Sequence, residues 1–222
     1  MIDPMTTEYP TNAPGILRPF LGVKERRRSS SAKVTLGDDL RMATDALGAK
    51  SLAKHGISVV VFSAHCLKVN RRDELKRRIL VVSDVGVLLM DERTKRIRRK
   101  FAWKDLKCVR MSVYADDFFA LVAPDEYDVL CACNRKTEAI VAMREMWKRY
   151  HHRNAGTGGI VMDGDNDNGA ELRVEAREKF TFMASATRER RVEFVRVGGG
   201  DVDVDIVDVD EDVDGDDEDE EA

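Results

Sequence analysis

The sequence predicts a mainly β fold, a barrel of about seven short strands closed by one helix, with an extra C-terminal pair of strands. Three observations support this prediction. Short β-prone apolar segments separated by polar turns fill residues 57–133, as in an all-β domain. A segment with the helical period follows at 136–150,. Two further segments, near 171–183 and 190–197, alternate apolar and polar residues in FTFM and VEFV.

The strands and turns follow one another in chain order. Residues 38–54 show a mixed helical period with apolar Leu40, Ala43, Leu47 and Leu52. We then expect strands at 58–69, 77–83, 85–91, 96–103, 107–113, 118–123 and 128–133,. Polar turns fit at 91–95 and 124–127,.

The closing helix is the clearest single element. Its apolar positions fall on one helical face. They are Ala139, Ile140, Met143, Met146, Trp147 and Tyr150. Lys148, Arg149 and the histidines at 151 and 152 suit the negative end of the helix dipole,.

Three regions divide the chain, whose length of 222 residues suits one domain with appendages,. Residues 1–20 hold four of the five prolines and predict a disordered lead-in,. Residues 21–198 form the predicted domain, and residues 199–222 an acidic tail. The tail alternates Val and Asp, but like charges on facing strands oppose pairing, and too little apolar surface is present to offset ordering. We therefore expect it to be disordered.

Charge is distributed unevenly along the chain. Residues 200–222 contain ten Asp and four Glu, so all 37 Lys and Arg and only 27 of the 41 acids lie in residues 1–199. The net charge of −4 therefore hides a body of about +10 and a tail of about −14,. This asymmetry indicates a polyanion-binding body with an acidic appendage. The sequence leaves two roles open for the tail: competition with an anionic ligand, or a solubilising segment.

A cationic hairpin is the strongest functional signal. Two apolar strand segments, 59–62 and 79–82, flank a short stretch crowded with basic residues. They are Lys68, Arg71, Arg72, Lys76, Arg77 and Arg78. Only Asp73 and Glu74 oppose them there. Because paired strands hold such a loop in one place, the pattern suits a phosphate-bearing surface better than catalysis.

Two accessory basic patches accompany the hairpin. The first, Lys24, Arg26, Arg27 and Arg28, precedes three serines whose phosphorylation would cancel its charge,. The second, in residues 93–100, includes Arg96 and Arg98. Alternation divides 96–100 between two faces of a strand.

Catalytic and metal-binding patterns are missing from the sequence. It contains no GxxxxGK[ST], GxSxG or HExxH motif, and we expect no enzyme activity, no small-molecule substrate and no cofactor,. The four cysteines lie in apolar segments without zinc-site spacing, which predicts buried, reduced thiols rather than a metal centre,. A calcium-loop-like stretch at 163–174 has Asn168 and Val174 where Gly and Glu are needed,. No apolar segment is long enough to span a bilayer, and the first residues lack a secretory signal,.

Several segments together resemble the tail homology 1 (TH1) domain of class I myosins, without the motor. GVKERRRSSSAKVTLGDDL (22–40) is similar to its basic first segment. VVFSAHCLKVNRRDELKRRILVVSDVGVLLMD (60–91) resembles its first strands. The middle strands are matched at 97–124 by an SxxxDxFF pattern at Ser112, Asp116, Phe118 and Phe119. NRKTEAIVAMREMW (134–147) and FTFMASATRERRVEF (180–194) resemble the closing helix and the late strands.

The resemblance implies a pleckstrin-homology-like fold that binds anionic phospholipids, phosphoinositides in particular. Lys68 takes the basic position late in the first strand, and Lys76 and Arg78 take the pair entering the second. Arg71 and Arg72 lie in the loop that would face the headgroup, where Asp73 and Glu74 lower the positive potential.

We therefore expect a cytoplasmic protein, peripheral at the membrane or the cytoskeleton. Two alternatives remain open from the sequence. One is a protein-interaction adaptor of the actin and myosin cytoskeleton. The other, a nucleic-acid-binding basic domain, is disfavoured because zinc, helix-turn-helix and RNP-type signatures are missing.

Overall fold

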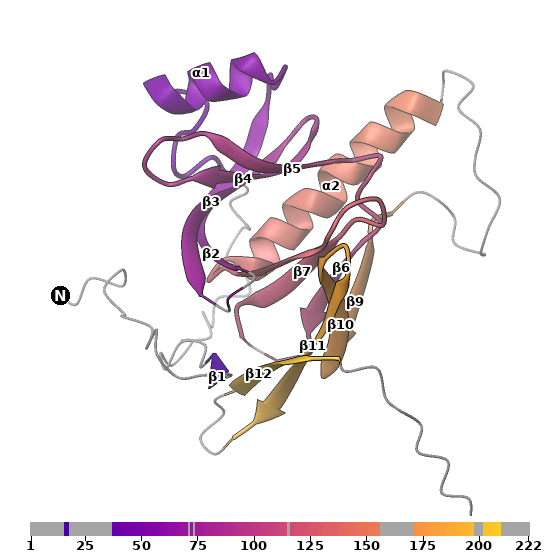
Figure 1. The fold of residues 1–222 in the computed structure, drawn as a ribbon. Coiled ribbons are helices and arrows are strands. Elements are labelled where there is room, and N and C mark those ends of the chain that lie inside the picture. Colours follow the sequence, from indigo (N-terminus) through magenta and orange to yellow (C-terminus); the bar gives the residue numbers. More distant parts are fainter. Residues whose placement is uncertain are drawn as a thin grey trace, which may run out of the picture.

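In the part of the chain that the structure describes, two β-sheets and two helices make up the fold (Figure 1). The structure is a computed structural model that describes residues 16–17, 37–70, 72, 74–114, 116–155, 171–197 and 202–209. One sheet has eight strands in the order β5-β4-β3-β2-β8-β7-β6-β9, and the other has four in the order β1-β12-β11-β10. The predicted mainly β class is confirmed.

The predicted seven strands are seven of the eight strands of the main sheet, with ends within two residues of those expected. They are β2 (Val60–Val69), β3 (Leu75–Ser83), β4 (Gly86–Asp91), β5 (Ile97–Ala102), β6 (Cys108–Ser112), β7 (Phe118–Val122) and β8 (Val129–Ala132). All pairings among these seven strands are antiparallel, and β2 joins the two halves by pairing with both β3 and β8. About seven strands and one closing helix are what the pleckstrin-homology-like resemblance implies.

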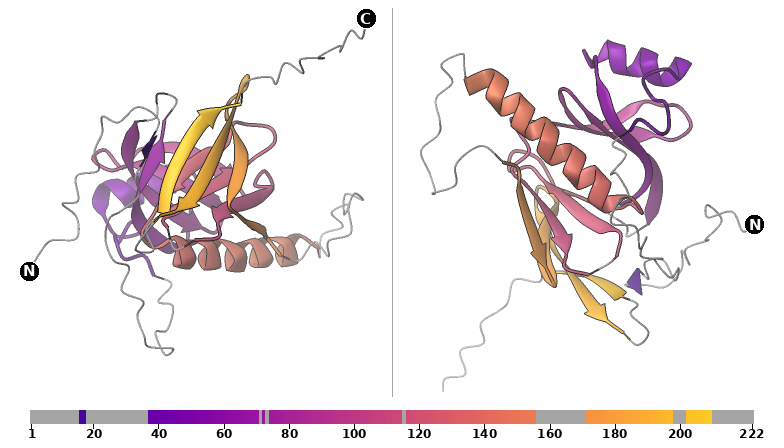
Figure 2. Two further views of the ribbon diagram at one scale, coloured as in Figure 1. Left: turned by 90° about the horizontal axis from the view of Figure 1, so that it is seen from below. Right: turned by 180° about the vertical axis from the view of Figure 1, so that it is seen from behind.

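Helix α2 (Lys136–Ala155) closes the sheet. It lies between the half of the sheet that holds β2–β5 and the half that holds β6–β9 (Figures 1 and 2). Its buried side chains Ala139, Met143 and Met146 enter one core cluster with residues of both halves. Trp147 packs edge-on against Trp103, with ring centroids 6.4 Å apart. The buried residues lie on one face of α2, and its opposite face, with Val141, Arg144 and Lys148, is exposed. The helix therefore closes the inner side of the main sheet with its apolar face.

Helix α1 (Ala46–Lys54) is shorter than the expected 38–54, because a turn precedes it. The carboxylate of Asp38 accepts hydrogen bonds from the amides of Met42 and Ala43. Asp45 then caps the helix by accepting from the amide of Gly48 at 2.7 Å,. Leu52 packs with residues of β3 and β4 on the face of the sheet that α2 does not cover. We call this the outer face and the α2 side the inner face.

The later strands differ from the expected single pair. The predicted strand at 171–183 divides at Glu178 into β9 (Arg173–Arg177), which joins β6 in parallel, and β10 (Lys179–Ser185). β10 pairs with β11 (Arg188–Arg196). β11 in turn pairs with β12 (Val202–Asp208), and the two-residue strand β1 (Ile16–Leu17) completes the second sheet.

Strand β12 corrects the prediction that residues 199–222 are disordered throughout. Val204 and Ile206 are buried against aromatic residues of β10 and β11. Asp208 forms ion pairs with Arg188 and Arg190, which β11 supplies. The prediction assumed that acidic strands would face one another. In the structure β12 pairs with β11, which is rich in arginine, so opposite charges face each other. The short strand β1 likewise lies inside the lead-in 1–20, of which the other residues are outside the described ranges.

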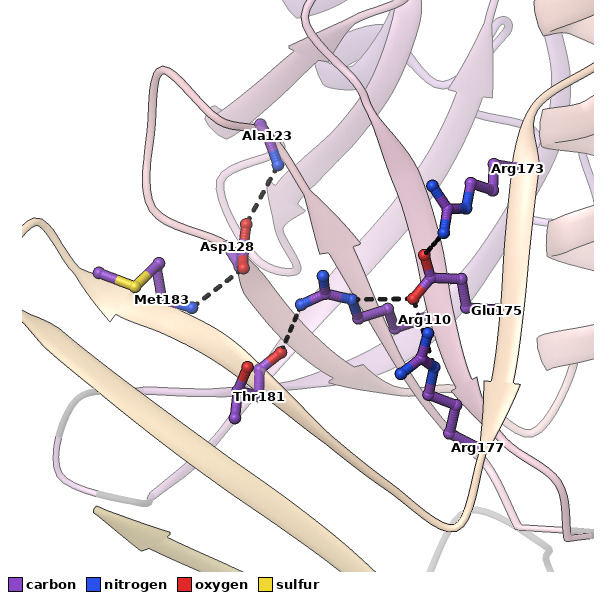
Figure 3. A network of polar contacts seen from close by, with 8 residues as sticks. All are labelled: Arg110, Ala123, Asp128, Arg173, Glu175, Arg177, Thr181 and Met183. Carbon is purple, nitrogen blue, oxygen red and sulfur yellow. Dashed lines mark hydrogen bonds and ion pairs between the residues drawn. The ribbon is translucent and has the colours of Figure 1, made fainter. Parts of the chain in front are cut away.

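A polar network fastens the second sheet to the main one (Figure 3). Arg110 of β6 forms an ion pair with Glu175 of β9 at 3.2 Å and donates to the carbonyl of Thr181 in β10 at 2.7 Å. The carboxylate of Asp128 accepts from the amides of Ala123 and Met183, at 3.1 and 3.0 Å. The two sheets are therefore held in register by side chains as well as by the apolar cluster between them.

Candidate anion-binding site

The three residues expected to bind a headgroup lie on one face of the β2–β3 hairpin. Lys68 is directly opposite Lys76, and Arg78 is opposite Cys66. Side chains two residues apart on a strand share a face, and farther along the hairpin the same positions hold Ala64 and Leu80 of the core cluster under α2. The three cations therefore continue the inner face beyond the point where its apolar part ends.

Two residues that the sequence analysis did not select complete this cluster. Arg99 of β5 lies with its guanidinium 3.9 Å from the ring centroid of Tyr127 and donates to the Tyr127 carbonyl at 2.6 Å. The ammonium of Lys68 lies 5.5 Å from the same ring centroid. We call Lys68, Lys76, Arg78 and Arg99 the basic rim, with Tyr127 between two of its members.

Carboxylates engage part of the basic rim. Arg78 pairs with Asp91 at 3.5 Å, and Arg99 pairs with Glu126 at 2.6 Å. The pKa of Asp91 is lowered, mainly because its carboxylate accepts hydrogen bonds from the amide and hydroxyl of Thr94. The positive charge of Arg78 lowers it further, so this carboxylate stays ionised. The two arginines are mostly buried, with 22% and 13% of the side chain exposed. They therefore fix the shape of the rim rather than present free charge.

The two lysines are more accessible to a ligand. Lys76 contacts Glu74 at 2.7 Å, but both side chains are 49% exposed, and such pairs exchange readily with water,. Lys68 forms no ion pair with any residue that the structure describes. The side chain of Asn70 holds the connecting turn by accepting from the amides of Arg72 and Glu74. Arg72 is exposed in that turn.

Three further predicted site residues that the structure describes lie beside the rim or on the other face of the sheet. Arg77 is opposite Leu67, and its place in the alternation of β3 puts it on the outer face. Arg98 lies 3.9 Å from Asp91, and Arg96 is exposed just before β5. Arg71 lies outside the described residues, as does the first accessory patch of Lys24, Arg26, Arg27 and Arg28.

None of the four rim residues lines the groove that the described residues form beside α2. A groove of about 400 Å³ lies between α2 and the start of β2, lined by residues such as Val60 and Met146. It is therefore at the opposite end of β2 from Lys68.

The four cysteines are buried, and burial raises the pKa of Cys133 to about 12. In the described ranges, neither helix has the apolar length needed to cross a bilayer.

Comparison with known proteins assigns the chain to a family. A family model described as "Unconventional myosin tail, actin- and lipid-binding" matches residues 26–211. The chain belongs to the myosin TH1 family. The match extends past residue 198 and includes β12, in agreement with the burial of that strand. The TH1 family is a class of binding modules, which fits the surface character of the rim.

Relatives and solved structures are distant. The chain is 24% identical to the myosin ID heavy chain of Dictyostelium discoideum over 164 residues, and 24% identical to the myosin IA heavy chain over 143. These matches cover 68% and 59% of this chain and 14% of each relative. Among solved structures, the PH domain of human oxysterol binding protein-related protein 11 aligns with 11% identity and a TM-score of 0.35, over 50% of this chain and 95% of that one. A Leishmania infantum C-terminal domain aligns with 14% identity and a TM-score of 0.38, over 44% and 92%.

The SxxxDxFF pattern of this sequence has a structural explanation. The hydroxyl of Ser112 accepts from the amide of Tyr114, and the carboxylate of Asp116 accepts from the amide of Phe118. Asp116 also pairs with Lys136 at the start of α2. The pattern therefore fixes the β6–β7 turn and the beginning of the closing helix.

Proposed function

We propose that this TH1 domain is a peripheral membrane module that binds anionic phospholipids, phosphoinositides in particular, through the basic rim. The observation that carries the proposal is the convergence of Lys68, Lys76 and Arg78 on one face, at the end of the hairpin where the apolar core stops. The lipid-binding description of the family supports it. The same description names actin, which supports a role in linking the membrane to the actin and myosin cytoskeleton.

The charges at the rim set the expected strength of binding. A Lys or Arg beside an anionic leaflet contributes about 1 kcal/mol, and this falls off within a Debye length. Lys68, Lys76 and Arg72 are the accessible cations, so we expect roughly 2 to 3 kcal/mol from them together. Arg78 and Arg99 contribute less because Asp91 and Glu126 already engage them. Binding by the rim alone is therefore weak and reversible.

Charge reversal on the two faces of the same sheet tests the proposal. Lys68→Glu with Lys76→Glu changes the inner face, whereas Arg77→Glu with Lys100→Glu makes the same change in net charge on the outer face, where Lys100 is opposite Leu88. Both pairs are compared with the unmodified chain by sedimentation with vesicles of graded phosphoinositide content. We expect the inner-face pair to lose most binding and the outer-face pair to keep most of it.

Equal losses from the two pairs would show attraction by net charge alone and would contradict a site at the rim. Sedimentation with filamentous actin separates the adaptor alternative. A module that joins membrane and cytoskeleton keeps actin binding when Lys68 and Lys76 are reversed, whereas a pure adaptor shows no vesicle binding in any variant. Duplex DNA at matched salt concentration provides the comparison for the nucleic-acid alternative.

A further inference from the structure

We propose that the acidic end of this chain, residues 210–222, binds the basic rim in the absence of a membrane and competes there with anionic lipid. This inference rests on the proposed function of the rim and adds its regulation. The segment contains ten acidic residues and no Lys or Arg. Three structural observations carry the inference: where the segment leaves the fold, how far the rim is from that point, and which cations along the way are already paired.

The segment leaves the fold at a fixed position. Strand β12 ends at Asp208, which forms ion pairs with Arg188 at 2.6 Å and Arg190 at 3.0 Å. The amide of Val209 donates to the carbonyl of Glu189 at 3.3 Å. The last described residue is therefore held at the β10–β11 hairpin, beside which β12 ends in the left view of Figure 2.

A short series of contacts joins the β10–β11 hairpin to the rim. Glu189 is opposite Met183 in β10, and the amide of Met183 donates to the carboxylate of Asp128 at 3.0 Å. Asp128 follows Tyr127, whose ring contacts Lys68 and Arg99. Neighbouring strands are about 4.8 Å apart, so this route from Val209 to Tyr127 is on the order of 20 Å.

The segment is long enough to reach the rim. Its thirteen residues span up to about 43 Å when extended, at about 3.3 Å per residue,. A tether of this length keeps the acidic residues near the rim at a local concentration on the order of millimolar. Weak charge pairing is sufficient for competition under these conditions, because the rim also binds lipid weakly.

Three arginines of β11, close to the exit point, are already engaged by acids of the second sheet. Arg188 and Arg190 pair with Asp208, and Arg191 pairs with Glu193 at 2.7 Å. Lys68, in contrast, has no ion-pair partner in the described part of the chain, and Lys76 has only the exposed Glu74. The two accessible lysines of the rim therefore offer positive charge with which the acidic segment can pair.

A test of this competition needs a shortened chain that still contains β12. Removing residues 200–222 would delete β12 and expose the apolar cluster that Val204 and Ile206 complete. A chain ending at Val209 keeps β12 whole. It is compared with the full chain, and with a full-length variant in which the ten acids of 210–222 are changed to Asn or Gln.

Two measurements are made on all three proteins. The first is binding to vesicles of phosphatidylcholine with phosphatidylserine and a phosphoinositide, at about 50 mM salt. We expect the shortened and the neutralised chains to bind about three- to tenfold more tightly than the full chain, and the difference to shrink at higher salt as screening increases. The second is zero-length carbodiimide crosslinking without lipid, mapped by mass spectrometry. We expect amides between 210–222 and Lys68 or Lys76, and not Lys50 or Lys54 of α1.

The two measurements keep the inference separate from the proposed function. Crosslinks to Lys68 and Lys76 with no vesicle binding by any protein would support the contact and overturn the lipid function. Vesicle binding that is equal in all three proteins, with no crosslinks at the rim, would overturn the inference and leave the lipid function standing. Crosslinks spread evenly over Lys50, Lys54, Lys68 and Lys76 would also overturn it.

Discussion

At the scale of single residues, buried polar side chains secure the turns and junctions of this fold. The ammonium of Lys136 lies 3.1 Å from the carboxylate of Asp116, with 3% and 1% of the side chains exposed. A charge in such a place is tolerated only because its partner compensates the loss of water. The pair joins the β6–β7 turn to the first residue of α2, so it positions the helix that covers the inner face.

Removing one partner of this pair should be costly. We expect Lys136→Met to lower the free energy of unfolding by about 3 to 5 kcal/mol, because Asp116 is then left buried and uncompensated. Urea unfolding monitored by circular dichroism measures this change in the free energy of unfolding. Arg144→Met is the matched control on the same helix: its ion pair with Glu171 is exposed, and its loss should cost less than about 1 kcal/mol,. Similar values for the two variants would contradict this account of the buried pair.

The carboxyl of Asp128 gives a prediction about pH. Burial raises its pKa, although the amides of Met183 and Ala123 oppose the shift. A raised pKa means that the folded state holds this proton more tightly than the unfolded state, so the contribution of Asp128 to stability falls as pH rises from about 4 through the raised value. The difference in unfolding free energy between the native chain and Asp128→Asn should therefore shrink over that window. A difference that stays constant or grows between pH 4 and 7 would rule out this effect.

Only some of the rim residues could be predicted from the sequence. Lys68, Lys76 and Arg78 were identified from their spacing in two strands, because strand alternation is regular there. Arg99 was not, because an irregularity between Leu89 and Met90 shifts the register of β5 against β4. The contribution of Tyr127 depends on the loop between β7 and β8 folding back across the rim, and no local pattern encodes such a contact.

At the scale of elements, the late strands decide where the folded domain ends. β12 buries Val202, Val204 and Ile206 in the cluster between the two sheets. The burial of such a side chain contributes about 1.5 to 3 kcal/mol. Seven strands and the closing helix were predictable from periodicity, but β12 was not, because its stability comes from the arginines and aromatics of a strand it meets only in the fold.

Two truncations separated by ten residues should therefore behave differently. A chain ending at residue 199 lacks β12, and we expect it to unfold at a clearly lower temperature or to aggregate. A chain ending at residue 209 should melt within a few degrees of the full chain. Ile206→Ala in the full chain provides an intermediate case, and we expect it to lower the free energy of unfolding by about 2 to 4 kcal/mol. Equal melting temperatures for the two truncated chains would mean that β12 does not contribute to the domain.

At the scale of the whole molecule, opposite charges are gathered at different places on one fold. The basic rim lies at one end of the inner face, and the most acidic part of the chain departs from the β10–β11 hairpin. The outer face carries Arg77 and Lys100, so the total charge of the domain does not by itself say which surface meets a membrane. The central claim is that the inner-face rim does so.

Lysine footprinting tests that claim most directly. The chain ending at Val209 is treated briefly with acetic anhydride, with and without vesicles that contain a phosphoinositide, and acetylation of each lysine is measured by mass spectrometry. The account predicts that vesicles protect Lys68 and Lys76, while Lys100 on the outer face and Lys54 on α1 react as before. Protection of Lys100 or Lys54 with no change at Lys68 and Lys76 would contradict it.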